Sequence, residues 1–281
     1  MTQTPQDRPA AAPILVLGGA GKTGRRVAAR LAEAGEPVRI GSRAGAPPFD
    51  WNAPSGWAAV LDGARAAYIA YAPDLAAPGG PEAVAAFAEL AVRQGVRRLV
   101  LLSGRGEEEA LRAERLLRET GAAWTVLRSS WFAQNFSESF LRDAVMAGEV
   151  LLPVDGAPEP FIDADDIAEI AAAALTRDGH EGRTYDITGP ELLTFAEATA
   201  VIAEAAGRPV RFRSVSPAAF SEGMVAQGAP AELAEVLVEL FGKVLDGRNA
   251  SLTDGVQRAL GRPPTRFANY ARRAAAAGAW A

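Results

Sequence analysis

Short apolar runs alternate with amphipathic, alanine-rich stretches along the first two thirds of the chain. Short apolar runs bounded by turn residues predict buried strands, and apolar positions three or four residues apart predict helices. Strands are expected at 14–17, 38–40, 67–71, 96–103 and 124–128, with one more just before Asp50, and helices at 24–34, 81–94 and 107–120. This β-α-β-α order is typical of an α/β fold, a doubly wound parallel sheet covered by helices on both faces.

The pattern changes after residue 129. Residues 129–149 are aromatic and helical, 161–175 read as a short strand and a helix, and the tail from Pro217 is mostly helical. Residues 183–189 predict a strand that returns to the main sheet. We therefore expect a nucleotide-binding domain over residues 13–155 and a smaller, mostly helical substrate-binding part over residues 156–281.

Composition narrows the class of protein. Of 281 residues, 49% are hydrophobic and 22% are charged, which suits a globular chain with a large core. A formal charge of −5 argues against nucleic-acid binding, and the absence of cysteine excludes disulfides and suits a reducing cytoplasm. The first dozen residues lack the pattern of a signal peptide and read as a frayed tail, and no apolar run predicts a membrane span. A monomer or a homodimer is expected.

A glycine-rich stretch, "VLGGAGKTGRR" at residues 16–26, follows the first predicted strand. Its glycines Gly18, Gly21 and Gly24 are spaced G-x-x-G-x-x-G, and the next predicted helix begins among them. A tight glycine turn at a helix N-terminus binds the pyrophosphate of a dinucleotide, because backbone N–H groups and the helix dipole point at it. Lys22 and Thr23 are expected to add phosphate contacts. A glycine loop that only turns the chain is the alternative.

The end of the second strand indicates which dinucleotide is bound. The sequence there is "VRIGSRAG", with Ser42 and Arg43 where NAD-binding proteins carry an acidic residue. An arginine suits the 2′-phosphate, so we predict NADP(H) rather than NAD(H), against the alternative of a solvated loop arginine. Asp50 and Trp51 are expected to flank the adenine and Tyr71 to line the cofactor, although plain packing explains these three residues equally well.

The catalytic pair of a related enzyme class is missing. The glycine pattern and the sheet resemble the short-chain dehydrogenase/reductases, whose usual members carry Tyr-x-x-x-Lys. The only lysines are Lys22 and Lys243, and neither follows a tyrosine by four residues. Ser103, at the end of a predicted strand, remains as the candidate catalytic residue that contacts the nicotinamide or the substrate. A polar strand end is the alternative.

The order of motifs resembles the NmrA-like, atypical short-chain dehydrogenase/reductases, above all the ergot-alkaloid reductase type and its bacterial relatives. The resemblance rests on "ILVLGGAGKTGRR", "LLSGRG", "WTVLRSSWFAQNFSE", "FIDADDIAEIAAAAL" and "YDITGPELLTFAEA", and it covers about residues 13 to 275. It implies a Rossmann domain, NADP(H) binding and a substrate cleft. It also implies that Trp131, Phe132, Asn135 and Phe136 border the nicotinamide and bind substrate, although core packing explains the three aromatic residues equally well.

The absence of the Tyr-x-x-x-Lys pair, which supplies the proton in the usual members, restricts the chemical class of the hydride acceptor. An iminium ion needs no acid, and a quinone delocalises the charge that it receives, whereas a simple ketone requires an acid for its alkoxide. We expect an NADPH-dependent reductase of an iminium, a quinone or an enone. A regulator that senses NADP(H) without turnover is the main alternative, and an isomerase or epimerase that uses bound cofactor is a third.

Two further features suggest structural roles. His180, the only histidine, lies between glycines in an expected surface turn, which argues against a catalytic triad or a histidine metal site. Asp163, Asp165 and Asp166 stand at a predicted helix start, where acidic residues favour the helix dipole. We interpret them as helix-capping residues and predict no metal.

Overall fold

A computed structural model describes residues 12–226 and 228–281, so the expected frayed tail lies almost entirely outside the described residues. The described chain divides into two compact units. Unit 1 holds the described residues up to Ser103, with Glu109–Val126 and Ala168–Thr184. Unit 2 holds Gly104–Glu108 and the described residues of Leu127–Ile167 and Tyr185–Ala281. The predicted boundary between residues 155 and 156 stays a prediction.

The main sheet has the doubly wound order that the alternating pattern predicts. Its strands, in the order β2-β1-β3-β4-β5-β7, are β2 (Val38–Gly41), β1 (Ile14–Leu17), β3 (Ala66–Ile69), β4 (Arg98–Gly104), β5 (Ala123–Ser129) and β7 (Arg183–Ile187). Strand β1 pairs in parallel with β2 and β3, and β3 pairs in parallel with β4. All four side chains of β1 are buried, as expected for a parallel strand covered on both faces. The predicted return of residues 183–189 to this sheet is confirmed.

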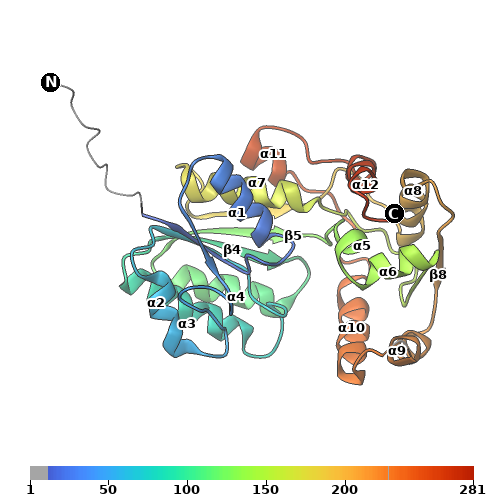
Figure 1. Ribbon diagram of the computed structural model, residues 1–281, viewed down its shortest axis with the longest axis horizontal. Helices are drawn as coiled ribbons and strands as arrows, with labels where there is room; N and C mark the ends of the chain where they lie inside the picture. The colour runs from blue at the N-terminus through green and yellow to red at the C-terminus, as the bar shows by residue number, and fades with distance from the viewer. Residues whose placement is uncertain (1–11, 227) are drawn as a thin grey trace. The chain divides into compact units, whose positions relative to one another are not determined.

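Helices cover both faces of the sheet in unit 1. They are α1 (Gly24–Glu33), α2 (Trp57–Leu61) after the 3₁₀ helix η1 (Pro54–Gly56), α3 (Gly80–Arg93), α4 (Glu108–Glu119) and α7 (Ala164–Thr176). In Figure 1, α1 and α7 lie on one face, and α2, α3 and α4 lie on the other. The predicted start and end of α1 are confirmed, because Gly35 follows the helix with a φ of +77°, a conformation that glycine adopts without strain.

Two predicted strands are wrong. Residues 42–53 form turns rather than a strand before Asp50, because Pro47 and Pro48 have no N–H to donate to a sheet. The N–H groups of Gly45 and Phe49 instead donate to the carbonyl oxygen of Ser42, at 3.0 and 2.8 Å. The strand expected at the start of residues 161–175 is reduced to a single parallel bridge between Ile162 and Phe132.

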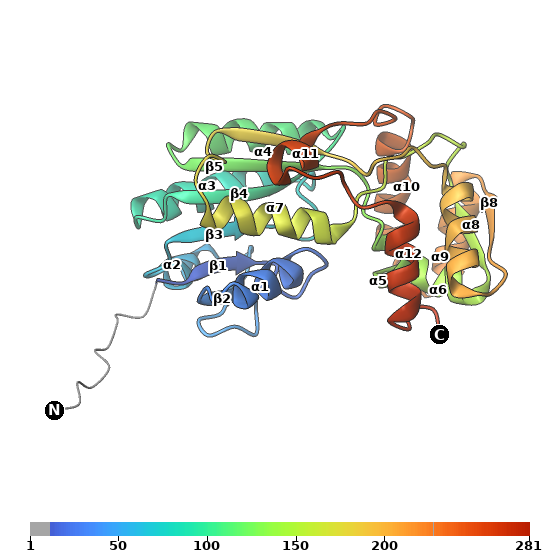
Figure 2. The ribbon, with the colours of Figure 1, turned by 90° about the horizontal axis from the view of Figure 1, so that it is seen from above.

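Unit 2 combines a small parallel sheet with helices. Strands β6 (Glu149–Leu152) and β8 (Arg211–Ser214) pair in parallel, and the helices are α5 (Asn135–Glu138), α6 (Phe140–Ala147), α8 (Phe195–Ala206), α9 (Pro217–Ala226), α10 (Ala231–Val244), α11 (Gly255–Leu260) and α12 (Phe267–Ala276). Helix α8 begins with a capping box, in which Thr194 and Glu197 satisfy each other's backbone N–H groups. Figure 2 shows α8 beside α12, and aromatic side chains fill much of the core between the helices of this unit.

No helix within the described ranges combines the length and the apolar composition needed to cross a bilayer. The same residues contain no group of three or more His, Cys, Asp or Glu side chains that could hold a metal ion.

Candidate functional site

The glycine loop in unit 1 forms a tight turn between β1 and α1. Gly18 has a φ of +67°, and its carbonyl oxygen accepts a hydrogen bond of 2.8 Å from the N–H of Gly21. A Cβ on Gly24 would lie 2.2 Å from that same oxygen, and a Cβ on Gly21 would lie 3.1 Å from it. Glycine therefore suits all three positions, because Gly18 adopts left-handed backbone and because Gly21 and Gly24 closely approach the carbonyl oxygen of Gly18.

The N-terminus of α1 offers backbone donors rather than a side-chain cap. Thr23 is its N-cap residue and makes no side-chain capping bond, and no acidic residue stands in the first turn. The first N–H groups of a helix have no partner within the helix, so an anion stabilises this end. The turn and the helix end together fit the pyrophosphate of a dinucleotide.

An orphaned hydroxyl lies close to this loop. Tyr68 on β3 is fully buried, and its hydroxyl has no hydrogen-bond partner among the described residues. Burial raises the pKa of Tyr68, and the nearby Thr23 side chain offsets part of the rise. The phenol thus stays neutral and carries an unused donor, a feature that a strand pattern alone does not reveal.

The end of β2 presents a cation to solvent. Arg43 is exposed and makes no hydrogen bond or ion pair with another residue of the described chain, while Ser42 beside it is half-buried. Arg39, on β2 itself, is different, because its guanidinium donates to the carbonyl oxygens of Val60 and Asp62. Arg43 is therefore the arginine at this strand end with a guanidinium available to a ligand.

Two predicted cofactor residues meet after β2 and β3. The rings of Trp51 and Tyr71 lie 4.9 Å apart at an angle of 47°, and both are half-buried against the core of unit 1. Asp50 holds the adjoining turn, because its Oδ1 accepts from the N–H of Asn52 and its carbonyl oxygen accepts from the Trp57 indole. The two rings form a small aromatic surface near the end of β3.

Ser103, the predicted catalytic residue, lies near the end of β4 and is buried. Its hydroxyl donates a hydrogen bond of 2.8 Å to Oε1 of Glu114 on α4, a side chain with 0% exposure. Arg118, one turn further along α4, donates to Oε2 of the same carboxylate at 3.1 Å. This bond uses the hydroxyl proton of Ser103, so the lone pairs of its oxygen remain to accept a further hydrogen bond.

The predicted substrate residues lie in unit 2 with different exposure. Trp131, Phe132 and Asn135 are half-buried, whereas Phe136 has no exposed surface and packs against the rings of Phe161, Phe195 and Phe267. The Trp131 ring contacts Phe241 at a centroid distance of 5.5 Å. The indole Nε1 of Trp131 is buried and has no hydrogen-bond partner in the described chain.

A buried acid that the sequence did not single out supports this stretch. Glu159 is 2% exposed, and its Oε1 accepts a hydrogen bond of 3.3 Å from the backbone N–H of Trp131. Burial raises the pKa of Glu159 to about 7, although the Trp131 N–H and the positive charge of Arg105 act in the opposite direction. This carboxyl group therefore exchanges its proton near neutral pH.

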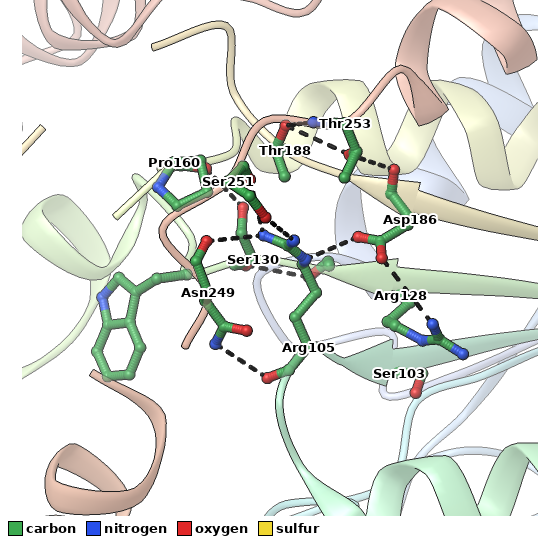
Figure 3. A network of polar contacts seen from close by, with 12 residues as sticks. Ser103, Arg105, Arg128, Ser130, Pro160, Asp186, Thr188, Asn249, Ser251 and Thr253 are labelled. Carbon is green, nitrogen blue, oxygen red and sulfur yellow. Dashed lines mark hydrogen bonds and ion pairs between the residues drawn. The ribbon is translucent and has the colours of Figure 1, made fainter. Parts of the chain in front are cut away.

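Arg105 is the centre of a polar network in unit 2 (Figure 3). It is 8% exposed, and its Nε lies 2.7 Å from Oδ1 of Asp186 on β7. Its other guanidinium nitrogens donate to the carbonyl oxygens of Asn249 and Ser251 and to the Ser251 hydroxyl, at 3.0 to 3.2 Å. The motif "LLSGRG" thus supplies a structural arginine as well as the candidate serine.

His180 is buried, and members of the acidic cluster cap a helix and form ion pairs. The expectation that His180 lies on the surface is wrong, because its side chain is only 9% exposed and burial lowers its pKa. The capping role at the start of α7 is confirmed for Asp163, whose Oδ1 accepts from the N–H of Asp165 at 2.9 Å. Asp163 also pairs with Arg273, and the buried Asp166 pairs with Arg262 at 2.8 Å.

Comparisons with known proteins identify relatives over more than 90% of the chain, although no family model matches. A Streptomyces griseus (4-alkanoyl-5-oxo-2,5-dihydrofuran-3-yl)methyl phosphate reductase is 35% identical over 92% of this chain and 96% of its own length. The NAD(P)H azoreductase of Xenophilus azovorans is 32% identical over 94% of this chain and 98% of its own length. Festuclavine synthase II of Penicillium roqueforti is 30% identical over 92% of this chain and 96% of its own length.

Solved structures share the fold at lower identity. The triphenylmethane reductase of Citrobacter sp., complexed with NADP(H), superposes with a TM-score of 0.75 at 22% identity, covering 93% of this chain and 99% of the other. The negative transcriptional regulator NmrA superposes with a TM-score of 0.65 at 18% identity, covering 92% of this chain and 94% of the other.

Proposed function

Because the chain belongs to the NmrA-like atypical short-chain dehydrogenase/reductases related to the ergot-alkaloid reductases, we propose that it is an NADPH-dependent reductase of a small activated acceptor. The acceptor is an iminium ion, a quinone or an enone, or another flat group of similar reactivity.

The observation that carries the proposal is the close approach of Gly24 to Gly18, because a side chain at Gly24 would fill the space in which the loop turns toward the end of α1. The loop and the first N–H groups of α1 bind the pyrophosphate, with Lys22 and Thr23 beside it. Arg43 and Ser42 donate hydrogen bonds to the 2′-phosphate, and the rings of Trp51 and Tyr71 shield the adenosine half of the cofactor. When bound, the reduced nicotinamide supplies hydride.

The relatives support an activated acceptor. One relative is named as an azoreductase, and another is named for a ring in which a carbon–carbon double bond is conjugated with carbonyl groups. Such groups are polarised before any protein side chain acts on them, which suits a chain without the Tyr-x-x-x-Lys pair. Trp131, Phe132 and Asn135 form the wall that orients the acceptor and excludes water, with Phe136 packed behind them. Ser103, fixed by Glu114, accepts a hydrogen bond from a donor group of the cofactor or the substrate.

The direct test is oxidation of NADPH by the purified chain in the presence of a panel of quinones, cyclic iminium ions, enones and simple ketones. Turnover with one of the first three classes, and much slower turnover with the ketones, is the expected result. Tight NADP(H) binding without turnover across the panel would overturn the reductase and favour a redox-sensing regulator. Calorimetry with each coenzyme measures the binding independently of turnover.

A further inference from the structure

Tyr68 lies on β3, next to the strand from which the glycine loop begins. It pairs with Val16 of β1 in the parallel register, two residues before Gly18. A Cβ on Gly18 would lie 3.2 Å from the Cβ of Ala70, so the loop turns against the residue that follows β3. The end of β3 and the loop are therefore neighbours within unit 1.

The Tyr68 side chain points to the face of the sheet that α1 covers. Ala67 and Ile69, on either side of it, belong to the core on the face of α2, α3 and α4. Side chains alternate between the two faces of a sheet, so Tyr68 lies on the opposite face, which α1 and α7 cover in Figure 1. Tyr68 has no exposed surface, and its hydroxyl lies near the side chain of Thr23.

The hydroxyl groups of Tyr68 and Thr23 have hydrogen-bonding capacity that the described chain does not use. Thr23 is the N-cap residue of α1, but its side chain makes no capping hydrogen bond to the helix. The Tyr68 hydroxyl has no hydrogen-bond partner among the described residues, although the Thr23 side chain lies close enough to lower its pKa. A buried hydroxyl without a partner costs free energy, so a hydroxyl left in this state suggests that ligand binding completes its bonding.

We propose that Tyr68 is a positioning residue for the pyrophosphate of the bound coenzyme, an assignment that rests on the dinucleotide site proposed above. The Thr23 hydroxyl donates to a phosphate oxygen and accepts the O–H of Tyr68 on one of its lone pairs. Each hydroxyl then has a partner, and the two hydrogen bonds polarise each other. Tyr68 makes no contact with the coenzyme and acts through Thr23, beside the first N–H groups of α1.

This arrangement predicts opposite effects of the Tyr68 hydroxyl on the free and the bound chain. In the free chain it is a buried donor without a partner, which lowers stability. In the bound chain it strengthens the contact between Thr23 and the phosphate. A hydroxyl with a purely structural role would instead stabilise the free chain as well.

The experiment compares the wild type with Tyr68→Phe, which removes the hydroxyl and keeps the ring. We expect the Tm of the chain without coenzyme to rise by about 1–4 °C, because the unpartnered hydroxyl is gone. The Kd for NADPH, measured by calorimetry, is expected to rise by about 10-fold, the worth of one hydrogen bond.

Tyr270→Phe is the matched control. Tyr270 is also buried, but its hydroxyl donates a hydrogen bond of 2.8 Å to the hydroxyl of Ser137. We expect this variant to lower the Tm and to leave the Kd for NADPH within about two-fold of the wild-type value. The two substitutions thus shift the Tm in opposite directions, which the loss of a hydroxyl group in itself would not produce.

Variants of Thr23 test whether Tyr68 acts through that residue. Thr23→Val removes the hydroxyl and keeps the branched shape. In this background Tyr68→Phe should raise the Kd for NADPH by no more than about two-fold, because the phenol has lost the group through which it acts. Thr23→Ser keeps a hydroxyl, so in that background the effect of about 10-fold should return. Equal effects of Tyr68→Phe in both backgrounds would contradict the route through Thr23.

A spectroscopic measurement needs no substitution, should Tyr68→Phe fail to fold. The tyrosine doublet in Raman spectra reports whether phenol groups donate hydrogen bonds. Addition of NADPH to the wild type should change this doublet toward stronger donation, and an unchanged doublet would contradict the proposal.

The outcomes separate this assignment from the site on which it rests. A Kd for NADPH that Tyr68→Phe leaves unchanged, or a Tm of the free chain that it lowers, overturns the role of Tyr68 alone. No binding of NADP(H) by the wild type overturns the dinucleotide site and the role of Tyr68 together.

Discussion

The hydroxyl of Ser103 donates a 2.8 Å hydrogen bond to Glu114, a carboxylate with no exposed surface. The bond orients the serine and also satisfies part of a buried charge. Because the carboxylate would lose one of its hydrogen-bond donors without the serine, the pair contributes to stability as well as to the position of the hydroxyl.

Ser103→Ala should therefore lower the free energy of unfolding by about 1.5–3 kcal/mol, the usual contribution of a hydrogen bond to a charged group. Urea denaturation followed by circular dichroism measures this loss. Ser55→Ala, at an exposed position of the same unit, is the control and should change stability by less than about 0.5 kcal/mol. Equal stability of the two variants would show that Glu114 is satisfied without the serine.

Gly24→Ala tests the turn of the glycine loop. The added methyl group would lie 2.2 Å from the carbonyl oxygen of Gly18, so either the loop or the start of α1 must move. We expect NADPH affinity to fall by at least about 10-fold, because the backbone donors lose their alignment. Calorimetric titration measures the affinity. Gly242→Ala on α10, where an added Cβ meets no atom within 4 Å, should leave it unchanged.

Arg43→Ala tests the choice of coenzyme. Loss of the exposed guanidinium should weaken NADPH binding by about 10- to 100-fold, the worth of a charge-assisted contact to phosphate, and leave NADH binding nearly unchanged. Separate fluorescence titrations with the two coenzymes measure the selectivity. Arg93→Ala, an exposed arginine at the end of α3, is the control. A parallel loss of both coenzymes would contradict a specific contact with the 2′-phosphate.

Sequence patterns predicted the sheet and the glycine loop because both depend on local chemistry. The buried run at 14–17 has the continuous apolar character of a parallel strand, and the turn favours glycine because Gly18 adopts left-handed backbone and Gly24 closely approaches the carbonyl oxygen of Gly18. The same local reasoning failed before Asp50, where the predicted strand contains Pro47 and Pro48. Their missing N–H groups outweigh the short apolar pattern.

The buried acid in unit 2 could not be predicted from its neighbours. Glu159 stands between Pro158 and Pro160 in a stretch without helix or strand periodicity, which reads as an exposed loop. Its burial comes from the bridge to Leu193 and from the bonds to Pro160, contacts between positions about 30 residues apart. His180 is a similar case, since a turn flanked by glycines gives no sign that its side chain packs inward.

Arg105→Ala tests the network drawn in Figure 3. Removal of the guanidinium takes one cationic partner from Asp186, which Arg128 also contacts at 3.9 Å, and takes a donor from two backbone carbonyl groups and the Ser251 hydroxyl, so we expect stability to fall by about 3 kcal/mol. Thermal and urea unfolding measure the loss, and Arg272→Ala on the exposed face of α12 should change stability by less than about 0.5 kcal/mol.

Arg105→Ala should also change the pH at which Glu159 loses its proton, an effect that lost packing alone would not produce. The positive charge of Arg105 lowers the pKa of Glu159, so its loss should raise that pKa and move the midpoint of Glu159 protonation, followed by the C=O stretch of the protonated carboxyl in infrared difference spectra, to higher pH. Where Arg105→Ala is too unstable to assay, Arg105→Lys keeps the charge and should keep the midpoint. A midpoint that does not move in a folded Arg105→Ala variant would contradict the coupling of the two residues.

Stability as a function of pH gives a last test of the buried carboxyl. The pKa of Glu159 is raised from 4.5 to about 7 in the folded chain, so between these values the unfolded chain releases a proton that the folded chain retains. Rising pH therefore favours the unfolded state through this window, and the cost becomes constant above pH 7.

Glu159→Gln removes that cost, because its amide does not ionise. The free energy of unfolding of Glu159→Gln minus that of the wild type should thus increase by about 2–3 kcal/mol between pH 5 and pH 8. Urea denaturation at both pH values measures the difference, and Glu204→Gln should show none because its carboxylate is exposed in the folded chain. A difference that stays constant would mean that Glu159 ionises equally in the folded and unfolded chain, and the acid would then be unprotonated at neutral pH.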